Sequence, residues 1–452
     1  MDNSKPNHLH STREPTLANL WPIALPLSGA MLSQAAVGLV DTALVGHLGG
    51  LALASVSIGS YLVFILVAVI TGLGTGWHGL VSQYSLSHKG LMGLGLVYGI
   101  VMSICLSITG ALVVDDVINV FVLDDRINSL AAHYSQSRLW ALPAIVLSIA
   151  ARIYWSERGT PWQYTQVVIL AHLANIPISY SLIYGVGGLP AMGAVGAGVG
   201  TSIALWLGVL LQLFLLFKQK VRFEAFPCQF SMTNWLLLLR FTWPPMLQQL
   251  AFALHLASFL WILSHLGASV MAASFAVLNV GLLLILPAIG LGQSALSLIG
   301  TAMANKDKVK VMAWSKLILA TGILTALALA LFVGVMAPWF AQLLLVNREL
   351  QHLTAMALPW YAAAMVFETC IIILSRFVLL TGLRKIGLIV VTASQWLLFL
   401  PLLAWLAPTY GFMAVWWLHI VYRILGVVIL WWIWRRYING LYTGQKISHN
   451  KE

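Results

Sequence analysis

The sequence predicts an all-α integral membrane protein of twelve transmembrane helices, in two six-helix lobes related by a pseudo-two-fold axis along the membrane normal. Of its 452 residues, 60% are hydrophobic and 8% are charged, whereas soluble domains average about 25% charged residues. Apolar runs of about 20 residues or more recur along the chain, and each is long enough to cross a bilayer. The second half of the chain also repeats landmarks of the first half, as expected for two copies of one helical unit.

The apolar runs are separated by polar or Gly/Pro-containing breaks and define the twelve spans. In order, the spans cover residues 17–46, 52–81, 91–114, 131–155, 162–186, 191–217, 234–264, 270–302, 310–337, 354–381, 385–407 and 411–436. The expected organisation is an N-terminal tail (1–16), an N-lobe (17–217), a linker (218–233), a C-lobe (234–436) and a C-terminal tail (437–452). The first run is too long for a signal-peptide core, so we expect it to remain as the first span.

Basic residues follow the even-numbered spans and are nearly absent after the odd-numbered ones. The loops after even-numbered spans contain Lys89, Arg158, Lys218, Lys220, Arg222, Lys306, Lys308, Lys310, Arg384 and Lys385. The loops after odd-numbered spans contain only Arg126 and Arg348 as basic residues. The positive-inside rule therefore predicts cytoplasmic termini and a multi-pass protein of the bacterial plasma (inner) membrane. Topology thus explains the net charge of +11, whereas nucleic-acid binding would require basic residues gathered on one face.

An internal repeat emerges when the chain is shifted by 218 positions against itself. The shift aligns Pro26 with Pro244, His47-Leu48-Gly49 with His265-Leu266-Gly267, and Gly72-Leu73-Gly74 with Gly290-Leu291-Gly292. Because each half contains six spans, both copies begin on the same side of the membrane, as in parallel repeats. In this register Asp41 aligns with Phe259. The two halves therefore share a scaffold but not the acid.

Asp41 is the one acid of the first span, which also contains Pro22 and Pro26. A charged carboxylate near the middle of a bilayer costs about 2.5–3.5 kcal/mol on insertion scales, so it usually faces a water-filled cavity or carries an ion or proton. A proline inside a helix lacks a backbone donor and can kink the helix. The first span is therefore predicted to contain a titratable site and a hinge. The alternative is that Asp41 lies solvated and inert at the outer mouth of the helix.

The other ionisable residues deep in the spans are expected to be Glu368, Arg423 and the histidines at 78, 172, 255 and 419, with Arg423 as the main deep arginine. Glu368 and Arg423 lie at similar depths, so we expect an ion pair. That pair can simply fix the helix register, or Glu368 can form a second cation site. His255 could titrate near physiological pH, or be a hydrogen-bonded core residue.

Neutral polar residues and missing motifs narrow the function. Asn175 in the fifth span and Thr201 in the sixth can bond a carboxylate, or merely join helices. The glycines around Gly196 and Gly200 follow no strand, so we expect them to allow close helix approach and not to bind phosphate. Metalloprotease, nucleophile-elbow, kinase and Walker motifs are absent from the sequence, which argues against an enzyme or an ATP-driven pump. Three cysteines without CxxC spacing indicate no metal site, and we expect no cofactor.

The first-span residues resemble a known family. Pro26 to Gly49, with Gln34 and the run Val40-Asp41-Thr42-Ala43-Leu44-Val45-Gly46-His47-Leu48-Gly49, is similar to the first helix of the multidrug and toxic compound extrusion (MATE) family, particularly its DinF-like branch. Gly72 to Gly76, Asn175 and the repeated six-span plan also resemble that family. The resemblance implies a secondary antiporter that exports amphipathic, often cationic drugs in exchange for protons or sodium.

The resemblance also implies roles for individual residues. Asp41, Asn175 and Thr201 would couple the cation, Pro26 would serve as the hinge, and Gln34 would assist. Many relatives have a second acid four residues after the helix-5 asparagine, but this chain has Ser179 there. Sodium-coupled relatives have acids in helices 7 and 10, whereas this chain offers His255 and Glu368. These departures favour protons over sodium as the coupling ion.

The sequence-based hypothesis is therefore a proton-coupled multidrug antiporter in which protonation of Asp41 and bending near Pro26 release the substrate. We expect small-molecule substrates and a lipid bilayer as partners, no nucleic acid, and function as a monomer. The alternatives are sodium-coupled export, an intramembrane enzyme, and a lipid-linked oligosaccharide flippase of the same superfamily plan. Such a flippase would require a basic cavity for its pyrophosphate headgroup.

Overall fold

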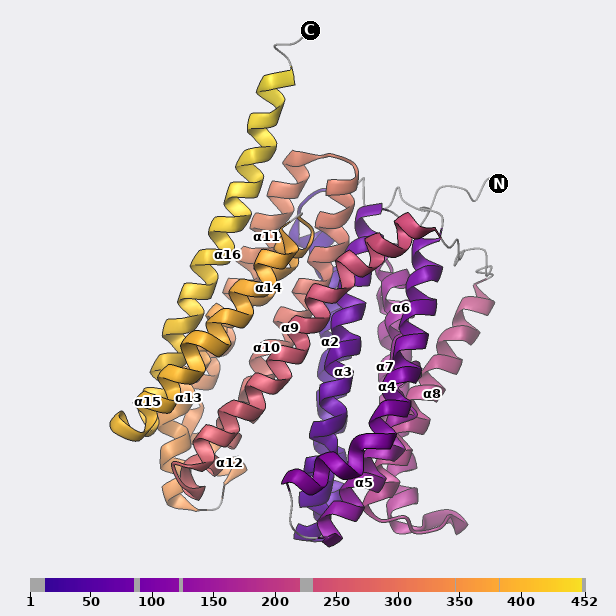
Figure 1. Cartoon of the computed structure of the whole chain (residues 1–452), viewed down its shortest axis with the longest axis vertical. Helices are drawn as coiled ribbons and strands as arrows, with labels where there is room; N and C mark the ends of the chain where they lie inside the picture. The colour runs from indigo at the N-terminus through magenta and orange to yellow at the C-terminus, as the bar shows by residue number, and fades with distance from the viewer. Residues whose placement is uncertain are drawn as a thin grey trace. The chain divides into compact units, whose positions relative to one another are not determined.

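A computed structural model describes residues 13–84, 90–121, 125–219, 231–345, 347–381 and 383–448, without the side chains at 120, 121, 268, 384 and 441–448. Every regular element within these ranges is a helix (Figure 1). Twelve helical segments in the described ranges are long and apolar enough to cross a membrane. The predicted all-α membrane fold with twelve spans is confirmed.

The helices follow one another in the order expected from the apolar runs. The first half contains α2 (Leu17–Gly46), α3 (Gly50–Tyr84), α4 (Leu91–Phe121), α5 (Asp125–Leu139), α6 (Leu142–Glu157), α7 (Trp162–Tyr184), η1 (Val186–Gly188) and α8 (Ala194–Lys218). The second half contains α9 (Met232–Ser264), α10 (Ala268–Ala304), α11 (Lys308–Val335), α12 (Ala337–Leu344), α13 (Arg348–Leu379), α14 (Arg384–Ala393), η3 (Ser394–Phe399), α15 (Leu400–Tyr410) and α16 (Phe412–Ser448).

Two predicted spans are interrupted. The span predicted over 131–155 consists of α5 and α6, and the span predicted over 385–407 consists of α14, the π-helical segment η3 and α15. The first span matches its predicted bounds of 17–46. Most of the predicted linker, residues 220–230, lies outside the described residues, as do Lys89, Asp124 and Cys228.

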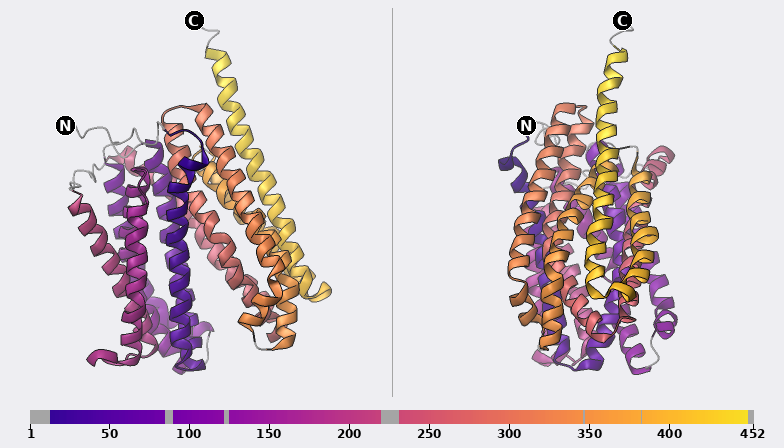
Figure 2. Two further views of the ribbon diagram at one scale, coloured as in Figure 1. Left: turned by 180° about the vertical axis from the view of Figure 1, so that it is seen from behind. Right: turned by 90° about the vertical axis from the view of Figure 1, so that its left-hand side faces the viewer.

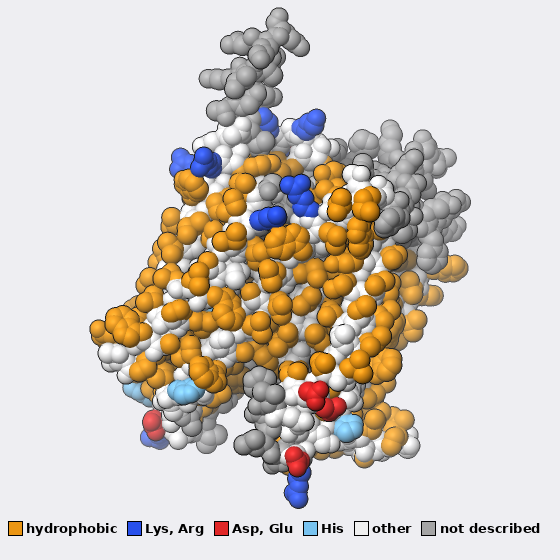
Figure 3. Space-filling view, viewed as in Figure 1, with side chains coloured by type: hydrophobic (Ala, Val, Ile, Leu, Met, Phe, Trp, Pro, Cys, Tyr) orange, Lys and Arg blue, Asp and Glu red, His pale blue; other side chains and the backbone are white. Residues whose placement is uncertain are grey.

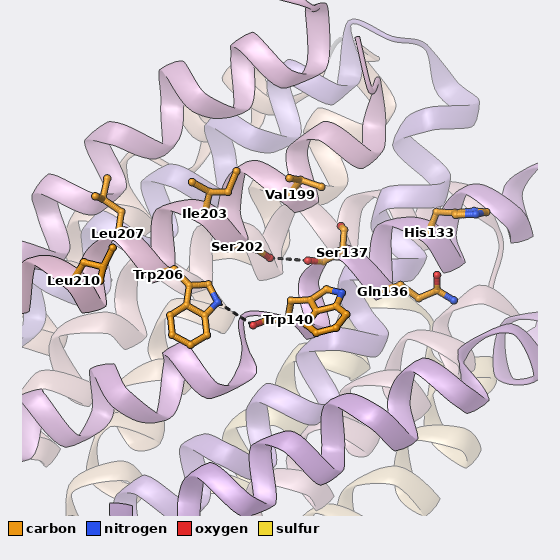
Figure 4. A pocket seen from close by; sticks show the side chains of 10 residues that line it. All are labelled: His133, Gln136, Ser137, Trp140, Val199, Ser202, Ile203, Trp206, Leu207 and Leu210. Atoms are coloured by element: carbon orange, nitrogen blue, oxygen red, sulfur yellow. Dashed lines mark hydrogen bonds between the residues drawn. The ribbon is translucent and has the colours of Figure 1, made fainter. Parts of the chain in front are cut away.

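The break between α5 and α6 follows from Pro143, at the start of α6. Proline has no N–H for the carbonyl of Leu139, four residues earlier. The Ser107 hydroxyl donates to that carbonyl oxygen instead, at 2.8 Å. Trp206 Nε1 donates to the carbonyl oxygen of Trp140 at 3.1 Å (Figure 4). Side chains of α4 and α8 thus replace backbone bonds that a membrane-spanning helix cannot leave open.

The chain separates into two compact units, and the division falls inside helices. Unit 1 contains Gly29–Leu250, and unit 2 contains the described residues up to Ser28 together with those from Ala251 onward. Leu17–Ser28 of α2 therefore packs in unit 2, while Gly29–Gly46 packs in unit 1. In the same way α9 contributes Met232–Leu250 to unit 1 and Ala251–Ser264 to unit 2. The lobe bounds expected from the sequence, which divide at the linker, remain a prediction.

Each unit has its own hydrophobic core. In unit 1, α7 packs along α8, and α3 packs on α5. In unit 2, α13 packs against α10, α11 and α16, and Figure 2 shows the orange α13 beside the yellow α16. On the face drawn in Figure 3, hydrophobic side chains cover the helices between their ends, and the coloured charged side chains lie toward the helix ends. This distribution suits helices surrounded by lipid.

Glycines allow equivalent close contacts in the two units. A Cβ placed on Gly72 of α3 would lie 2.6 Å from Met246 Cα of α9, within unit 1. A Cβ placed on Gly290 of α10 would lie 2.9 Å from Ser28 Cα of α2, within unit 2. The shift of 218 positions found in the sequence relates Gly72 to Gly290 and Ser28 to Met246. The repeat therefore preserves this backbone contact, which needs a residue without a side chain.

We expect Gly72→Ala to lower the free energy of unfolding by about 1–3 kcal/mol, because its methyl group would overlap the backbone of α9. The matched control is Gly38→Ala in α2, where an added Cβ meets nothing within 4 Å. There the substitution should be neutral or slightly stabilising, because alanine favours a helix. Unfolding in detergent, followed by tryptophan fluorescence, compares the two. Equal stability of both variants would show that the α3–α9 contact is looser than described.

Candidate functional site

Unit 1 encloses a cavity of about 320 Å³ that contains the polar residues predicted from the sequence. Gln34 and Asp41 of α2, Asn175 of α7 and Thr201 of α8 all line it. Apolar side chains such as Met31 and Ile149 supply much of the remaining lining. The volume lies at the lower end of the range for small-molecule sites, about 300–1,000 Å³. The structure thus brings together four residues that are separated by up to 167 positions in the sequence.

Asp41 is hydrogen-bonded by Thr201. The Thr201 hydroxyl lies 3.1 Å from Asp41 Oδ2 and 2.8 Å from the carbonyl oxygen of Ala197, one turn earlier in α8. A hydroxyl has a single proton to donate. Thr201 can therefore serve only one of these two acceptors at a time, and the carboxylate competes with the backbone for that proton.

Close packing of α7 and α8 places Asn175 and Thr201 in the same cavity. A Cβ on Gly200 would lie 2.8 Å from Ser179 Cα, and a Cβ on Gly196 would lie 2.7 Å from the carbonyl of Leu182. The glycines of α8 therefore allow close helix approach, as expected from the sequence. Ser179, four residues after Asn175, donates to Asn175 Oδ1 at 3.1 Å.

Pro26 lies in an unbroken helix close to the boundary between the units. The α2 helix runs from Leu17 to Gly46 with Pro22 and Pro26 inside it. The division between units falls at Ser28 and Gly29, within one helical turn of Pro26. A proline weakens the hydrogen-bond ladder of its own helix turn. The role of Pro26 as a hinge remains a prediction, now with a definite place in the fold.

Two arginines in the cavity were missed by the sequence analysis, which expected Arg423 to be the main deep arginine. Arg138, in the last turn of α5, and Arg152 of α6 both line the cavity. Arg152 is 5% exposed. Its Nε and Nη2 atoms have no hydrogen-bond partner among the described residues. The signal was present in Ala150-Ala151-Arg152-Ile153, an arginine inside an apolar run.

Other polar residues of the cavity lining are hydrogen-bonded within unit 1. Ser33 is hydrogen-bonded to His172 Nδ1, and both residues lie in unit 1. Gln212 accepts from Trp155 Nε1 at 3.1 Å and donates to the carbonyl oxygen of Tyr164 at 3.2 Å. These two bonds fix α8 against α6 and α7. They use one of the two N–H donors and one of the two acceptor lone pairs of the Gln212 amide.

Unit 2 contains the ion pair expected from the sequence. Arg423 Nε of α16 donates to Glu368 Oε2 of α13 at 2.8 Å. The guanidinium also lies over two aromatic rings, 5.7 Å from the centroid of Tyr361 and 5.2 Å from that of Tyr422. Ion pairing and cation–π contacts together compensate this buried charge. The transport role considered for Glu368 remains a prediction.

His255 packs against the π-helical segment in the same unit. Its ring centroid lies 5.3 Å from that of Phe399, and its Nδ1 atom has no hydrogen-bond partner among the described residues. The described residues contain no group of three His, Cys, Asp or Glu side chains arranged to hold a metal ion. His255 is therefore an aromatic packing residue in this arrangement, and its role in coupling remains a prediction.

A second buried pair of ionisable residues was also missed. His78 Nε2 of α3 and Glu157 Oε1 of α6 are 3.0 Å apart, with His78 fully buried and Glu157 6% exposed. The sequence analysis placed His78 inside a span, whereas Glu157 lies two residues beyond the predicted fourth span (131–155). Helix packing brings the two together near the ends of α3 and α6.

The MatE family model matches residues 26–181 and 244–405. A probable multidrug resistance protein NorM of Pasteurella multocida is 26% identical over 347 residues, which cover 72% of each chain. The multidrug resistance protein MdtK of Edwardsiella ictaluri is 26% identical over 351 residues, covering 74% of this chain and 75% of the relative. A crystal structure of MATE in complex with MaL6 has a TM-score of 0.89 at 18% identity and covers 97% of this chain and 100% of its own. That structure is similar in fold.

We expect Glu368→Ala to destabilise the protein by about 3–5 kcal/mol, because it leaves Arg423 buried without its anion. The double variant Glu368→Leu/Arg423→Met should recover most of that loss. Glu349→Ala is the matched control, since Glu349 is an exposed acid in the first turn of the same helix. Unfolding in detergent measures all four proteins. If Glu368→Ala keeps its stability but loses transport, Glu368 is a transport residue and the pair is not primarily structural.

Proposed function

The chain belongs to the MatE family, whose model matches residues 26–181 and 244–405, and from this premise we propose that it is a proton-coupled multidrug antiporter. It exports amphipathic, often cationic small molecules by alternating access. The observation that carries the proposal is the Asp41 carboxylate, hydrogen-bonded by Thr201 inside a cavity of drug-sized volume. The relatives named multidrug resistance proteins support it.

The proton switch consists of Asp41 and the single proton of the Thr201 hydroxyl. When Asp41 is charged, Thr201 donates to Oδ2, over the observed distance of 3.1 Å. When Asp41 is protonated, its own O–H can donate to the Thr201 oxygen, and the Thr201 hydroxyl then donates to the carbonyl of Ala197 at 2.8 Å. Both states give the Thr201 hydroxyl an acceptor and Asp41 Oδ2 a partner, while Asp41 Oδ1 has no hydrogen-bond partner among the described residues.

Competition at Asp41 couples the proton to the substrate. A basic substrate group is attracted to the charged carboxylate, and protonation from outside removes that attraction and favours release. The bend near Pro26 then changes the direction of α2, next to the change of unit at Ser28 and Gly29. Release of the proton to the inside restores the charged site. Asn175 lines the same cavity and supplies a neutral partner for the polar groups of the ligand.

The proton gradient is sufficient for useful export. Moving one proton inward across 100 mV releases about 2.3 kcal/mol. One pH unit adds about 1.4 kcal/mol. At one-to-one electrogenic exchange, the sum supports a substrate gradient of about 500-fold.

The cavity chemistry favours protons over sodium. Asp41 is the one acid among the described lining residues, and two arginines line the same cavity. Hard metal cations need several oxygen ligands, and nearby guanidinium groups repel a bound cation. The DinF-like branch, the monomeric state and the cytoplasmic termini belong to the same proposal.

The flippase alternative calls for a basic cavity, and Arg138 and Arg152 meet that requirement in unit 1. The volume of about 320 Å³ argues against it. That space suits a drug-sized molecule and not an oligosaccharide with its pyrophosphate. We therefore favour drug export, and a lipid-translocation assay in the same vesicles distinguishes the two functions.

Asp41→Asn should fold and insert but lose substrate-driven proton movement, because the amide cannot take up the coupling proton. Asp115→Asn is the matched control, since Asp115 is an exposed acid of α4 in the same unit. A pH-sensitive dye inside proteoliposomes records the response to added substrate. Normal proton movement by Asp41→Asn would contradict the proposal.

Replacing sodium with potassium on both sides of the membrane should leave the rate of drug export unchanged, whereas a protonophore should abolish it. The reason is that the cavity offers one carboxylate, which suffices for a proton and is poor for a metal cation. Accumulation of a fluorescent drug inside everted membrane vesicles measures the export rate under both conditions. A requirement for sodium would overturn the choice of ion and leave the assignment of drug export standing.

A further inference from the structure

Arg152 is a buried cation that the proton-coupling mechanism does not use. It lies in α6, is 5% exposed and lines the cavity of unit 1. A guanidinium remains charged under all physiological conditions. A buried charge without a counter-ion is strongly unfavourable, so it is normally paired. The protein therefore holds a charge in its cavity whose natural partner would be an anion.

The chain itself does not provide that anion in the described structure. Asp41 is the one acid of the described lining; its Oδ2 accepts from Thr201, and it lies in the electrostatic field of Arg138. Glu157, five residues further along α6, is paired with His78. Tyr164 lines the same cavity but is a neutral phenol, and its hydroxyl is 3.4 Å from that of Ser148. The described cavity lining thus contains two arginines and one acid.

The free donors of Arg152 have a particular geometry. The atoms without a hydrogen-bond partner are Nε and Nη2. These two nitrogens form one edge of the planar guanidinium, and their N–H bonds point in parallel. That edge matches the two oxygens of a carboxylate, which it binds through two parallel hydrogen bonds. A halide or a single hydroxyl oxygen would have to share one acceptor atom between the two donors, whereas a carboxylate supplies a separate oxygen for each.

The other lining residues indicate the chemistry of the rest of the ligand. Met31, Val37, Val67 and Ile149 provide apolar lining. An aromatic or aliphatic body fits this surface, because such sites combine an apolar lining with a few placed polar groups. Asp41, which lines the same cavity, offers a place for a basic nitrogen.

We propose that Arg152 forms a carboxylate subsite in the unit 1 cavity. The exported substrates then include amphipathic molecules with a carboxylate. They also include zwitterions whose basic nitrogen reaches Asp41. The proposal rests on the proposed drug export and narrows its substrate class. Simple cations satisfy Asp41 but leave Arg152 unpaired. A substrate with both groups satisfies both, and its carboxylate is the group that selects it.

The test compares one rhodamine dye that has a free benzoic carboxylate with the methyl ester of the same dye. The two probes share their aromatic body and basic nitrogens and differ in the negative charge. Their transport is measured in proteoliposomes containing the full chain, under an imposed proton gradient. The wild type should have a KM for the acid that is about tenfold or more below that for the ester.

Arg152→Gln should raise the KM for the acid about tenfold or more and change that for the ester by less than about threefold, since a charge-assisted bidentate contact is lost. Arg152→Lys keeps the charge without the planar fork and should restore part of the difference. Arg348→Gln, an exposed arginine at the start of α13, is the control and should behave like the wild type. Benzoate alone should inhibit transport of the acid, and this inhibition should be lost in Arg152→Gln.

Several results would overturn the carboxylate subsite. Equal KM values of the wild type for acid and ester would do so without any variant, and therefore even if Arg152→Gln fails to fold. Equal losses for both dyes in a folded Arg152→Gln would assign the arginine to structure or coupling. Inhibition by benzoate that persists in Arg152→Gln would place the carboxylate elsewhere. If neither dye moves and no substrate drives proton movement through the wild type, the proposed export itself fails, which is a separate outcome.

Discussion

The cost of keeping a charge inside apolar helices is the constraint on which this structure depends. Such a charge persists only where a partner, a cavity or water lowers its free energy. Glu368 and Arg423 neutralise each other in unit 2, and His78 and Glu157 are paired in unit 1. Asp41 is different, because a threonine hydroxyl and a cavity replace a tight ion pair. The chain therefore separates charges that stabilise helices from charges that remain open to a proton or a ligand.

The first helix of each repeat is shared between the two compact units. The α2 and α9 helices each contribute to both compact units, and glycines of α3 and α10 hold them by close backbone contact. Contacts of this kind leave no room for a side chain at the glycine positions. Pro26 lies within one turn of the change of unit in α2. The proposed hinge therefore lies two residues before Ser28, whose backbone approaches Gly290 closely.

Much of this fold could be predicted from local sequence patterns. The twelve apolar runs predict the helices, and the shift of 218 positions predicts that Gly72 and Gly290 occupy equivalent places. The four polar residues Gln34, Asp41, Asn175 and Thr201 were expected together only through resemblance to a family, and they do line one cavity. Their spacing in the chain gives no indication of that, because helix packing decides which faces meet.

The features that were missed depend on contacts between helices. Arg152 occurs near the end of a predicted span, where an arginine usually reaches the membrane surface, and only the packed structure shows it buried in a cavity. The break at Pro143 becomes tolerable because Ser107 and Trp206, from other helices, bond the freed carbonyls. The division of the units inside α2 and α9 has no local signal either, since both helices are continuous in sequence pattern and in structure.

The most direct measurement counts protons and substrate molecules at the same time. Purified wild-type protein in proteoliposomes would receive a fluorescent substrate under a proton gradient, while a second dye reports internal pH and sodium is absent. A fixed ratio near one proton per substrate molecule is expected, because Asp41 is the single acid of the described cavity lining. Substrate export that proceeds at the same rate without proton movement would contradict the proton switch at Asp41.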